Sequence, residues 1–147
     1  MANVTVRLDE GLQARIQVRD FSFIADEPVT DGGANSGPMP TEYLLGALGA
    51  CSAITVKLYA QRKGWPLEGV EVEVSRERFK KADYPAYTGE GDYVNEYRQT
   101  LQFKGPLTDE QKTRLLEIAG KCPVHRALTD PAFMIEELLT AEEAQPE

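Results

Sequence analysis

The sequence predicts an α+β fold in which runs of antiparallel strands alternate with helices. Three observations predict it. Residues 4–18 alternate apolar and polar side chains with period two, residues 43–56 form an apolar run framed by helix start and stop signals, and residues 70–75 and 96–104 again have the pattern of strands. The expected order is β-β-α-β-β-α-α-β, with the helices separated by antiparallel hairpins.

Length and charge narrow the class of protein. A chain of 147 residues suits one domain, and we expect residues 1–140 to form it and the acidic residues 141–147 to be a disordered tail. The net charge of −8 repels phosphate backbones and anionic lipid, so neither nucleic acid nor a membrane is an expected partner. The apolar run is shorter than the roughly 20 residues of a membrane helix. No secretory signal is recognisable at the N-terminus, so we expect a cytoplasmic protein.

The N-terminal segment predicts two strands and a short third one. Val4, Val6 and Leu8 alternate with polar neighbours, and a second alternation runs through residues 14–18. At Asp20 the apolar parity changes to Phe21 and Phe23, which indicates a bulge or bend before a third strand.

A glycine-rich loop over residues 28–40 precedes the long helix. We expect Thr41 to be its N-cap, Glu42 to favour the helix dipole in the first turn, and Gly64 to end it after residue 63. Small residues lie around most of its circumference, so other backbone is expected to approach closely. The helix is therefore predicted to be wrapped by sheet and buried on nearly all sides.

The second half of the chain predicts a hairpin, two helices and a last strand. Their expected residues are 70–75 and 96–104 for the strands, 80–95 for an aromatic loop between them, 108–119 for a helix opened by a capping box, 122 onward for a short helix, and 133–139 for the last strand.

Cys51 and Cys122 are the only cysteines in the chain, 71 residues apart. A dithiol pair can form a disulfide if the Cα atoms approach within about 6 Å, and otherwise both are expected to be ordinary buried side chains. Burial in the apolar helix would raise the pKa of Cys51. By local criteria Cys122, at a helix start beside His125, is the better activated thiol.

Three segments carry a resemblance to a known family. They are PTEYLLGALGACSAIT at residues 40–55, KLYAQRKGWPLE at 57–68 and CPVHRAL at 122–128. With the order of elements, they resemble the OsmC/Ohr superfamily, the osmotically inducible protein C and organic hydroperoxide resistance proteins. The resemblance implies antiparallel sheets packed around a long buried central helix in an intertwined homodimer.

The resemblance also implies a thiol-dependent peroxidase. Cys51 would be the peroxidatic cysteine, forming a sulfenic acid as an organic hydroperoxide is reduced to its alcohol. Cys122 would be the resolving cysteine, closing a disulfide that an external dithiol reopens. The implied chemistry needs no metal and no organic cofactor.

An arginine and a glutamate activate the first cysteine in the catalytic members that this chain resembles. Their glutamate stands ten residues before that cysteine, where this chain has Thr41, while Glu42 stands nine before. On a regular helix Glu42 lies about 13 Å along the axis from Cys51 and points to the opposite side, so it would act from a partner chain or as a structural acid. Arg15 and Arg19, on one face of a strand, are the candidate arginines, and Arg126 is a further one.

Two other interpretations are open. A metal site built from Cys122, His125, Cys51 and Glu42 is disfavoured, since zinc sites usually need tighter ligand pairs. A non-catalytic or weakly catalytic dimer that binds a small apolar molecule at its interface, with the cysteines as packing residues, is the alternative function.

Overall fold

The computed structural model describes residues 3–140. Its elements are β1 (Val4–Arg7), β2 (Ala14–Val18), β3 (Phe21–Ala25), α1 (Pro40–Lys63), β4 (Gly69–Lys80), β5 (Tyr93–Lys104), α2 (Asp109–Ala119) and α3 (Pro123–Thr129), with short 3-10 turns at Val29–Asp31 and Lys81–Asp83. β1, β2 and β3 form one antiparallel sheet, and β4 and β5 form another. Mixed helices and antiparallel sheets around a long helix confirm the predicted fold class.

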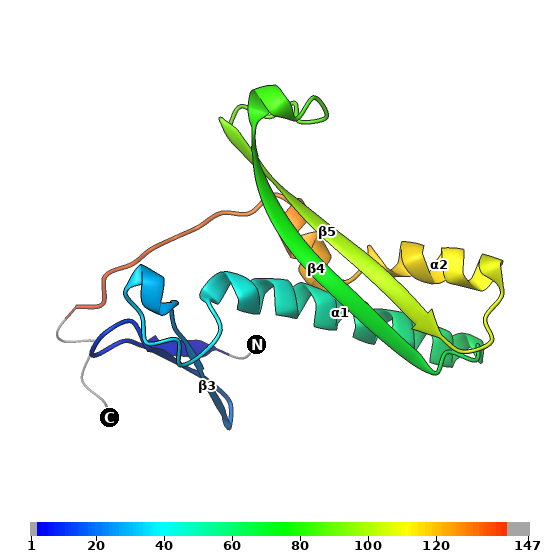
Figure 1. Cartoon of the computed structure of the whole chain (residues 1–147), viewed down its shortest axis with the longest axis horizontal. Coiled ribbons are helices and arrows are strands. Elements are labelled where there is room, and N and C mark those ends of the chain that lie inside the picture. Colours follow the sequence, from blue (N-terminus) through cyan, green and yellow to red (C-terminus); the bar gives the residue numbers. More distant parts are fainter. Residues whose placement is uncertain (1–2, 141–147) are drawn as a thin grey trace.

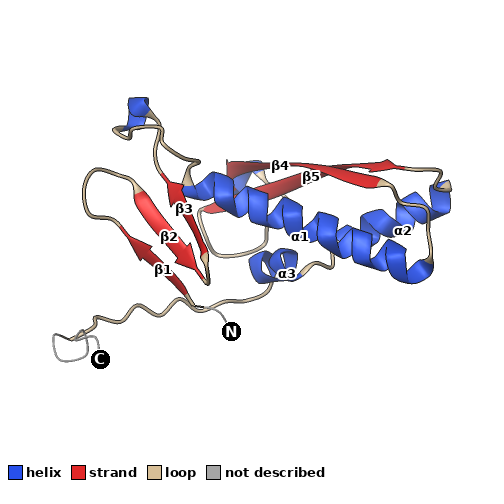
Figure 2. Cartoon of the chain, turned by 90° about the horizontal axis from the view of Figure 1, so that it is seen from below, coloured by secondary structure: helices blue, strands red, loops and turns tan. Residues whose placement is uncertain are grey.

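The long helix α1 organises the chain. The β4–β5 hairpin lies along it, with α2 beside its C-terminal half (Figure 1). The sheet of β1 to β3 projects from the other end, beyond the first turn of α1 (Figure 2). The two sheets are therefore at different distances from the helices, and only β4–β5 is packed along α1.

The hydrophobic core lies between the C-terminal half of α1, α2 and the β4–β5 hairpin. Its members share low exposure and an apolar side chain, and they are Val56, Ala60, Leu67, Leu107, Leu115, Ile118 and Ala119. Tyr59 and Trp65 pack against this core with their ring centroids 5.5 Å apart, in an edge-to-face arrangement.

The N-terminal strands form as predicted, and the parity change has a simple cause. Arg19 and Asp20 form a two-residue turn between β2 and β3, and Arg19 adopts a positive φ of 50°. Val18 therefore pairs directly with Phe21, and Ile16 with Phe23. Because directly opposed residues of an antiparallel pair share a face, the apolar face continues through the turn. Of the predicted bulge or bend, the structure has a tight turn that leads into the predicted third strand.

The start of α1 differs from the prediction. The helix begins at Pro40 with Met39 as N-cap, so the prediction that Thr41 caps it was wrong. Proline has a fixed φ that suits the first helical position, and one carboxylate oxygen of Glu42 accepts a 2.8 Å hydrogen bond from the Met39 N–H. Gly64 ends the helix at φ 67°, as predicted.

One face of α1 is buried and the other is exposed in the chain. Leu48, Ser52, Val56 and Ala60 form a buried stripe at four-residue spacing. Ile54 and Leu58, on another side, are 60% and 54% exposed. The prediction that the helix is buried on nearly all sides is therefore wrong for a single chain, because β4, α2 and α3 cover only part of its circumference.

Of the helices in residues 3–140, α1 alone is long and apolar enough to span a membrane by length and composition. Its apolar stripe packs on β4, α2 and α3. This packing gives the apolar character of α1 a structural reason that involves no membrane.

The β4–β5 hairpin is longer than the sequence pattern indicated. The ladder runs from Gly69 opposite Lys104 to Lys80 opposite Tyr93, so the predicted loop over residues 80–95 shortens to residues 81–92. Main-chain hydrogen bonds between β4 and β5 continue beyond the residues in which apolar and polar side chains alternate. The predicted half-buried strand at residues 70–75 is confirmed as part of β4.

The two C-terminal helices begin where the sequence predicts. Thr108 Oγ1 accepts a hydrogen bond from the Gln111 N–H, and the Gln111 side chain accepts one from the Thr108 N–H. Cys122 is the N-cap of α3.

The predicted last strand at residues 133–139 is wrong for the chain as described. Residues 131–140 have no regular structure, and Phe133 and Leu138 are 93% and 94% exposed. A strand needs a neighbour for its main-chain hydrogen bonds, and none of the strands in the described residues pairs with this segment. The predicted disordered tail at residues 141–147 lies outside the described residues.

Candidate functional site

The fold brings Cys51 and Cys122 together. Cys51 lies in the first half of α1, and Cys122 caps the start of α3, which packs on α1. Both are free thiols, close enough for each to affect the pKa of the other. Cys51 is half-buried, whereas Cys122 is fully buried. A reagent from solvent therefore reaches Cys51 first.

Burial is the main reason why the pKa of Cys51 is raised above its ordinary value. The Val124 N–H lowers it, and the neighbouring Cys122 thiol raises it further. In this chain alone, Cys51 is predominantly a thiol near neutral pH. The sequence-based expectation that burial raises its pKa is confirmed.

The pKa of Cys122 moves in the opposite direction. Burial pushes it up, but hydrogen bonds from the Ser52 hydroxyl and the His125 N–H, with smaller effects from Cys51 and the Val124 N–H, outweigh burial and lower it overall. The His125 N–H lies 3.2 Å from the Cys122 sulfur. The prediction that Cys122 is the better activated thiol by local criteria is therefore confirmed.

Ser52 is a residue of this site that the sequence patterns did not single out. It is 0% exposed, its Oγ lies 3.2 Å from the Ala119 carbonyl oxygen, and it is 3.6 Å from the Cys122 sulfur. A signal was present, since Ser52 stands four residues from both Leu48 and Val56 in the buried stripe. A polar residue in such a stripe must have a hydrogen-bonding partner inside the protein.

Within one chain, Glu42 does not lie beside the two cysteines. It is in the first turn of α1, nine residues before Cys51, and its carboxylate caps the helix by accepting a hydrogen bond from the Met39 N–H. Glu42 also lines a groove of about 970 Å³ that Phe23, Tyr43, Leu45 and Ala50 help to form.

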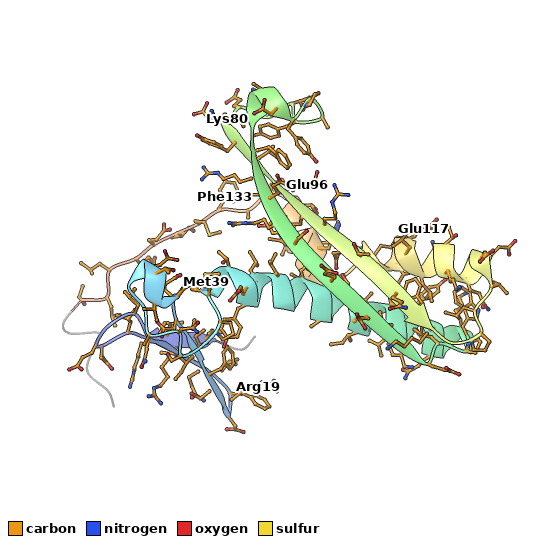
Figure 3. The ribbon with its side chains drawn as sticks, viewed as in Figure 1. Arg19, Met39, Lys80, Glu96, Glu117 and Phe133 are labelled. Carbon is orange, nitrogen blue, oxygen red and sulfur yellow. The ribbon has the colours of Figure 1, made fainter. Side chains whose placement is uncertain are left out.

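The candidate arginines also lie apart from Cys51. Arg15 is on β2, opposite Arg7 and Ile24. Arg19 is in the turn at the tip of the N-terminal sheet, with its guanidinium 5.0 Å from the centroid of the Phe21 ring (Figure 3). Neither arginine is among the groups that shift the pKa of Cys51 in the described chain. Arg126, the third candidate, is not among these groups either, so within residues 3–140 no cation is seen to shift the pKa of the half-buried thiol.

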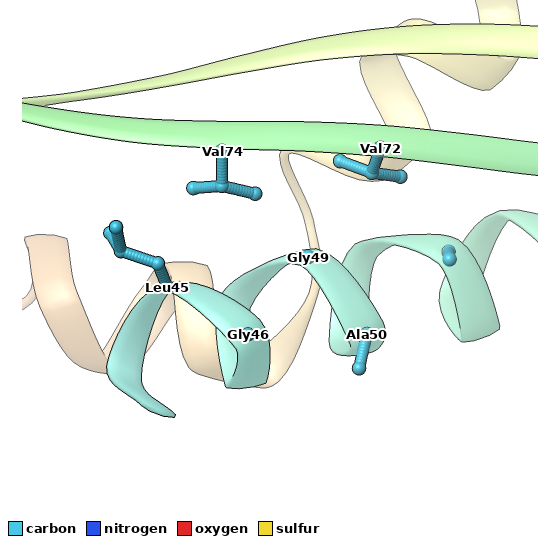
Figure 4. Close-up of a pocket in the computed structure, with 7 residues that line it drawn as sticks. Leu45, Gly46, Gly49, Ala50, Val72 and Val74 are labelled. Atoms are coloured by element: carbon cyan, nitrogen blue, oxygen red, sulfur yellow. The ribbon is translucent and has the colours of Figure 1, made fainter. Parts of the chain in front are cut away.

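The small residues of α1 form a second, apolar groove beside β4. Gly46, Gly49 and Ala50 line it from the helix, and Val72 and Val74 line it from the strand (Figure 4). A Cβ at Gly49 would lie 3.0 Å from a methyl group of Val74, so glycine is needed for this close approach. The close contact is with a valine side chain, whereas the Val72 carbonyl oxygen would lie 3.9 Å from that Cβ, so the predicted close approach of other backbone is not found at Gly49.

Within residues 3–140, no cluster of three or more His, Cys, Asp or Glu side chains is placed to hold a metal ion. Cys122 and His125 do adjoin, but the contact is between the sulfur and the main-chain N–H of His125.

The helix, the two antiparallel sheets and the adjacent thiols, one half-buried and one buried, define a class of small α+β proteins with a dithiol site. A profile of the family described as OsmC-like protein matches residues 33–136, more than half of the chain. The chain therefore belongs to the OsmC-like protein family, within the OsmC/Ohr superfamily, as the sequence resemblance predicted.

Solved structures support the same fold. An OsmC-like protein from Mycoplasma pneumoniae superimposes with a TM-score of 0.70 at 21% identity, covering 88% of each chain. The organic hydroperoxide resistance protein OsmC from Legionella pneumophila gives 0.65 at 16% identity, covering 88% of this chain and 90% of that one. OhrB of Bacillus subtilis, an organic hydroperoxide resistance protein, gives 0.62 at 20% identity, with 88% and 91% covered. No curated protein matched the sequence.

Proposed function

We propose that this protein is a cysteine-based peroxidase that reduces organic hydroperoxides to alcohols, as a defence against oxidative stress. The observation that carries the proposal is the adjacency of a half-buried Cys51 and a fully buried Cys122. Relatives of the same fold named as organic hydroperoxide resistance proteins support it.

The proposed reaction has three balanced steps. The Cys51 thiolate attacks the hydroperoxide, the O–O bond breaks, and the alkoxide leaves with a proton as the alcohol, which makes Cys51 a sulfenic acid. Cys122 then loses its proton and attacks the Cys51 sulfur, forming the S–S bond and releasing water. An external dithiol reduces this disulfide and is itself oxidised to a disulfide. The reaction as written uses no metal and no organic cofactor.

Exposure favours Cys51 for the first step and Cys122 for the second. Cys122 has the lower pKa of the two, but its sulfur is fully covered in the reduced chain. A peroxide cannot reach a nucleophile that is closed to solvent, so accessibility outweighs ionisation here. Cys51 then requires help with ionisation, because burial raises its pKa.

That help is proposed to come from a second copy of the chain. A nearby guanidinium would favour the Cys51 thiolate, and Arg15 and Arg19 lie on a sheet that projects away from its own Cys51. In a homodimer one of these arginines would approach Cys51 of the other copy. Glu42, besides capping its own helix, would hold that arginine by a charge-assisted hydrogen bond.

Exposed apolar surface supports the homodimer. Val4, Val6 and Phe21 on the N-terminal sheet are 57%, 56% and 58% exposed, and Ile54 and Leu58 on α1 are exposed as well. Soluble monomers rarely leave such an extent of apolar side chain open to water. An intertwined dimer would cover both surfaces, and would offer a neighbouring strand to the C-terminal segment.

The cytoplasm is the proposed compartment. A disulfide that forms in each cycle must be reduced again, and the reducing environment of the cytoplasm supplies dithiols for this step. The net charge of −8 gives no support for binding to nucleic acid or anionic lipid.

A second candidate function is the binding of a small apolar molecule without catalysis. The observation that favours it is the groove of about 970 Å³ lined by Phe23, Tyr43, Leu45 and other apolar residues, with Glu42 at its edge. In this alternative the two cysteines are packing residues and the thiols take no part.

Peroxide consumption distinguishes the two functions. Reduced protein is mixed with cumene hydroperoxide and dithiothreitol, and loss of the hydroperoxide is followed over many turnovers. The peroxidase proposal predicts turnover in the unmodified protein and its loss in Cys51→Ser. The Arg15→Gln and Arg19→Gln variants, compared with each other, identify which arginine raises the rate. Absence of turnover, with cumene hydroperoxide or its alcohol bound reversibly, would favour the binding function.

A further inference from the structure

Ser52 is a buried hydroxyl that the proposed reaction has not yet used. It joins three elements, since its Oγ on α1 lies near the Ala119 carbonyl at the end of α2 and near the Cys122 sulfur at the start of α3. Its side chain is 0% exposed, so water does not compete for these contacts. Any change in its hydrogen bonding must therefore involve these protein groups.

The Ser52 hydroxyl has one proton and can donate it to only one of these two neighbours at a time. The Ala119 carbonyl can only accept, whereas either Ser52 or Cys122 can donate in the 3.6 Å contact between oxygen and sulfur. With Cys122 protonated, Ser52 donates to Ala119 and the Cys122 S–H points to the Ser52 oxygen. With Cys122 ionised, the sulfur can only accept, and a hydrogen bond to a charged group is roughly twice as strong as one to a neutral carbonyl.

We propose that Ser52 is a positioning residue for disulfide closure, whose hydroxyl turns from the Ala119 carbonyl to the Cys122 sulfur when Cys122 loses its proton. The rotation is about one bond and moves no heavy atom. In the reaction, the Cys122 thiolate so stabilised attacks the Cys51 sulfur, the S–O bond breaks, and the hydroxide takes the released proton as water. This role in the reaction depends on the peroxidase function proposed above, but the hydroxyl switch does not.

Ser52 is better placed than the other groups around Cys122 to stabilise the Cys122 thiolate. From α1, the titratable neighbour is the Cys51 thiol, whose hydrogen bond to Cys122 lowers the pKa of Cys122 by less than the Ser52 hydrogen bond does. From α3, the main-chain N–H groups of Val124 and His125 approach the sulfur, while the His125 imidazole lines a cavity with Glu96 of β5. From α2, the contact at Ser52 is a carbonyl. Of the two side-chain donors from α1, Ser52 lowers the pKa of Cys122 more than Cys51 does, and Ser52 is the one that the proposed reaction does not oxidise.

The hydroxyl also explains how a fully buried thiol is ionised. Burial alone would raise the pKa of Cys122, and the Ser52 hydrogen bond is the largest of the effects that lower it. Without that hydroxyl, a buried thiolate would lose a donor and would be less populated at a given pH.

The direct test is an ultraviolet titration of Cys122 alone. In a Cys51→Ala background, the absorbance of the thiolate is followed against pH. Ser52→Ala should raise the midpoint by about one pH unit, equivalent to about tenfold less thiolate below the midpoint, because a hydrogen bond to a charged group is lost. Ser52→Thr, which keeps the hydroxyl, should restore the lower midpoint. Thr55→Val is the matched control, because the Thr55 hydroxyl donates to the Cys51 carbonyl on the same helix.

The result that would overturn the proposal is an unchanged midpoint in Ser52→Ala. If Ser52→Ala does not fold, the Cys51→Ala protein with Ser52 intact still provides a test. The carbonyl carbon-13 resonance of Ala119 should move with the same midpoint as the thiolate absorbance, since the carbonyl loses its hydroxyl donor. A resonance that stays constant through the titration would contradict the switch.

Kinetics then separate this proposal from the peroxidase proposal. After one equivalent of cumene hydroperoxide, Ser52→Ala in the two-cysteine protein should form the Cys51 sulfenic acid at the normal rate and close the disulfide about tenfold more slowly. If no sulfenic acid forms in any variant, the peroxidase function fails, while the titration still decides the role of Ser52. Equal closure rates at every pH would refute its role in the reaction.

Discussion

The two sheets of this protein have the same sequence pattern and different surroundings. In β4 and β5, the apolar positions face α1 and join a core in which Leu115 and Val56 are 0% exposed. In β1 to β3, the apolar positions are left with Val4 at 57% and Phe21 at 58% exposed. The contrast teaches that alternation defines which face of a strand is apolar, but not what covers that face.

The packed region should respond most strongly to loss of a side chain. Leu115→Ala is expected to lower the free energy of unfolding by about 2–5 kcal/mol, since it leaves a cavity among residues of the core. Leu116→Ala is the matched control, because Leu116 is the next residue on α2 and is 55% exposed. Its expected effect is within about 0.5 kcal/mol. Urea denaturation of both variants measures the difference, and similar losses would mean that the core is wrongly located.

A charge placed on the exposed apolar face of the N-terminal sheet should change how strongly two copies of the chain associate. Val6→Asp places a charge on its apolar face and is expected to weaken the proposed homodimer by about 2 kcal/mol, or roughly thirtyfold in the dissociation constant. Sedimentation at several concentrations should show a shift from twice the chain mass of 16.3 kDa toward that mass. Thr5→Asp, on the other face of β1, is the control. If Val6→Asp leaves the dimer intact, this face is not the interface.

These two regions also show how far the sequence could predict the fold. The long helix, its Gly64 end and the Thr108 capping box were predictable because each depends on contacts within a few residues. The missing strand at residues 133–139 was not, because strand formation depends on a neighbour that lies elsewhere. The prediction that α1 is buried on nearly all sides failed for a similar reason, since β4, α2 and α3 leave Ile54 and Leu58 exposed in one chain and only the proposed homodimer would cover them.

In the candidate site too, features that depend on nearby residues could be predicted, and features that depend on distant residues could not. The raised pKa of Cys51 could be predicted from burial in a helix, whereas the lowered pKa of Cys122 comes first from Ser52 and then from main-chain N–H groups at the helix start, and only the latter could be predicted. Their adjacency came only from the family resemblance, since 71 residues of intervening chain carry no local signal. A structural role for Glu42 was one of the two predicted alternatives, but its hydrogen bond to the Met39 N–H was not predicted, because the helix begins two residues earlier than an N-cap at Thr41 implies.

The loop that joins the two regions depends on a buried carboxylate. Asp26 is 1% exposed and accepts hydrogen bonds from the main-chain N–H groups of Glu27, Ala34 and Ser36 and from the Ser36 hydroxyl. The Ser36 hydrogen bonds are the main cause that lowers the pKa of Asp26 to about 2.

This lowered pKa gives a smaller, pH-dependent prediction. Because the folded pKa lies below the ordinary value of 3.8, the ionised carboxylate stabilises the fold above about pH 4, and this stability is lost as the pH falls toward about 2. Asp26→Asn should lower the melting temperature at neutral pH and flatten its dependence on pH between 4 and 2, as measured by circular dichroism. Ser36→Ala should have a partial effect. An unchanged pH dependence in Asp26→Asn would show that Asp26 does not hold this loop.

The smallest expected effect is at the start of α1. Glu42→Ala removes the acceptor for the Met39 N–H and should cost about 1 kcal/mol of stability, as the loss of a helix cap does. Glu42→Gln keeps an acceptor oxygen and should cost only a few tenths of a kcal/mol. Peroxide consumption by Glu42→Gln then separates its two proposed roles. A normal rate would leave Glu42 as a cap alone, and a slowed rate with normal stability would support its contact with an arginine of the second copy.

The adjacency of the two thiols is tested most directly by the mass of the reduced protein after one equivalent of cumene hydroperoxide. We expect a loss of two hydrogen masses for each chain, and a peptide pair that links Cys51 to Cys122 within one chain. We also expect Cys122→Ser to accumulate oxygen on Cys51 instead. Peptides that link Cys51 to Cys51 of another chain, or a mass that does not change, would contradict the account.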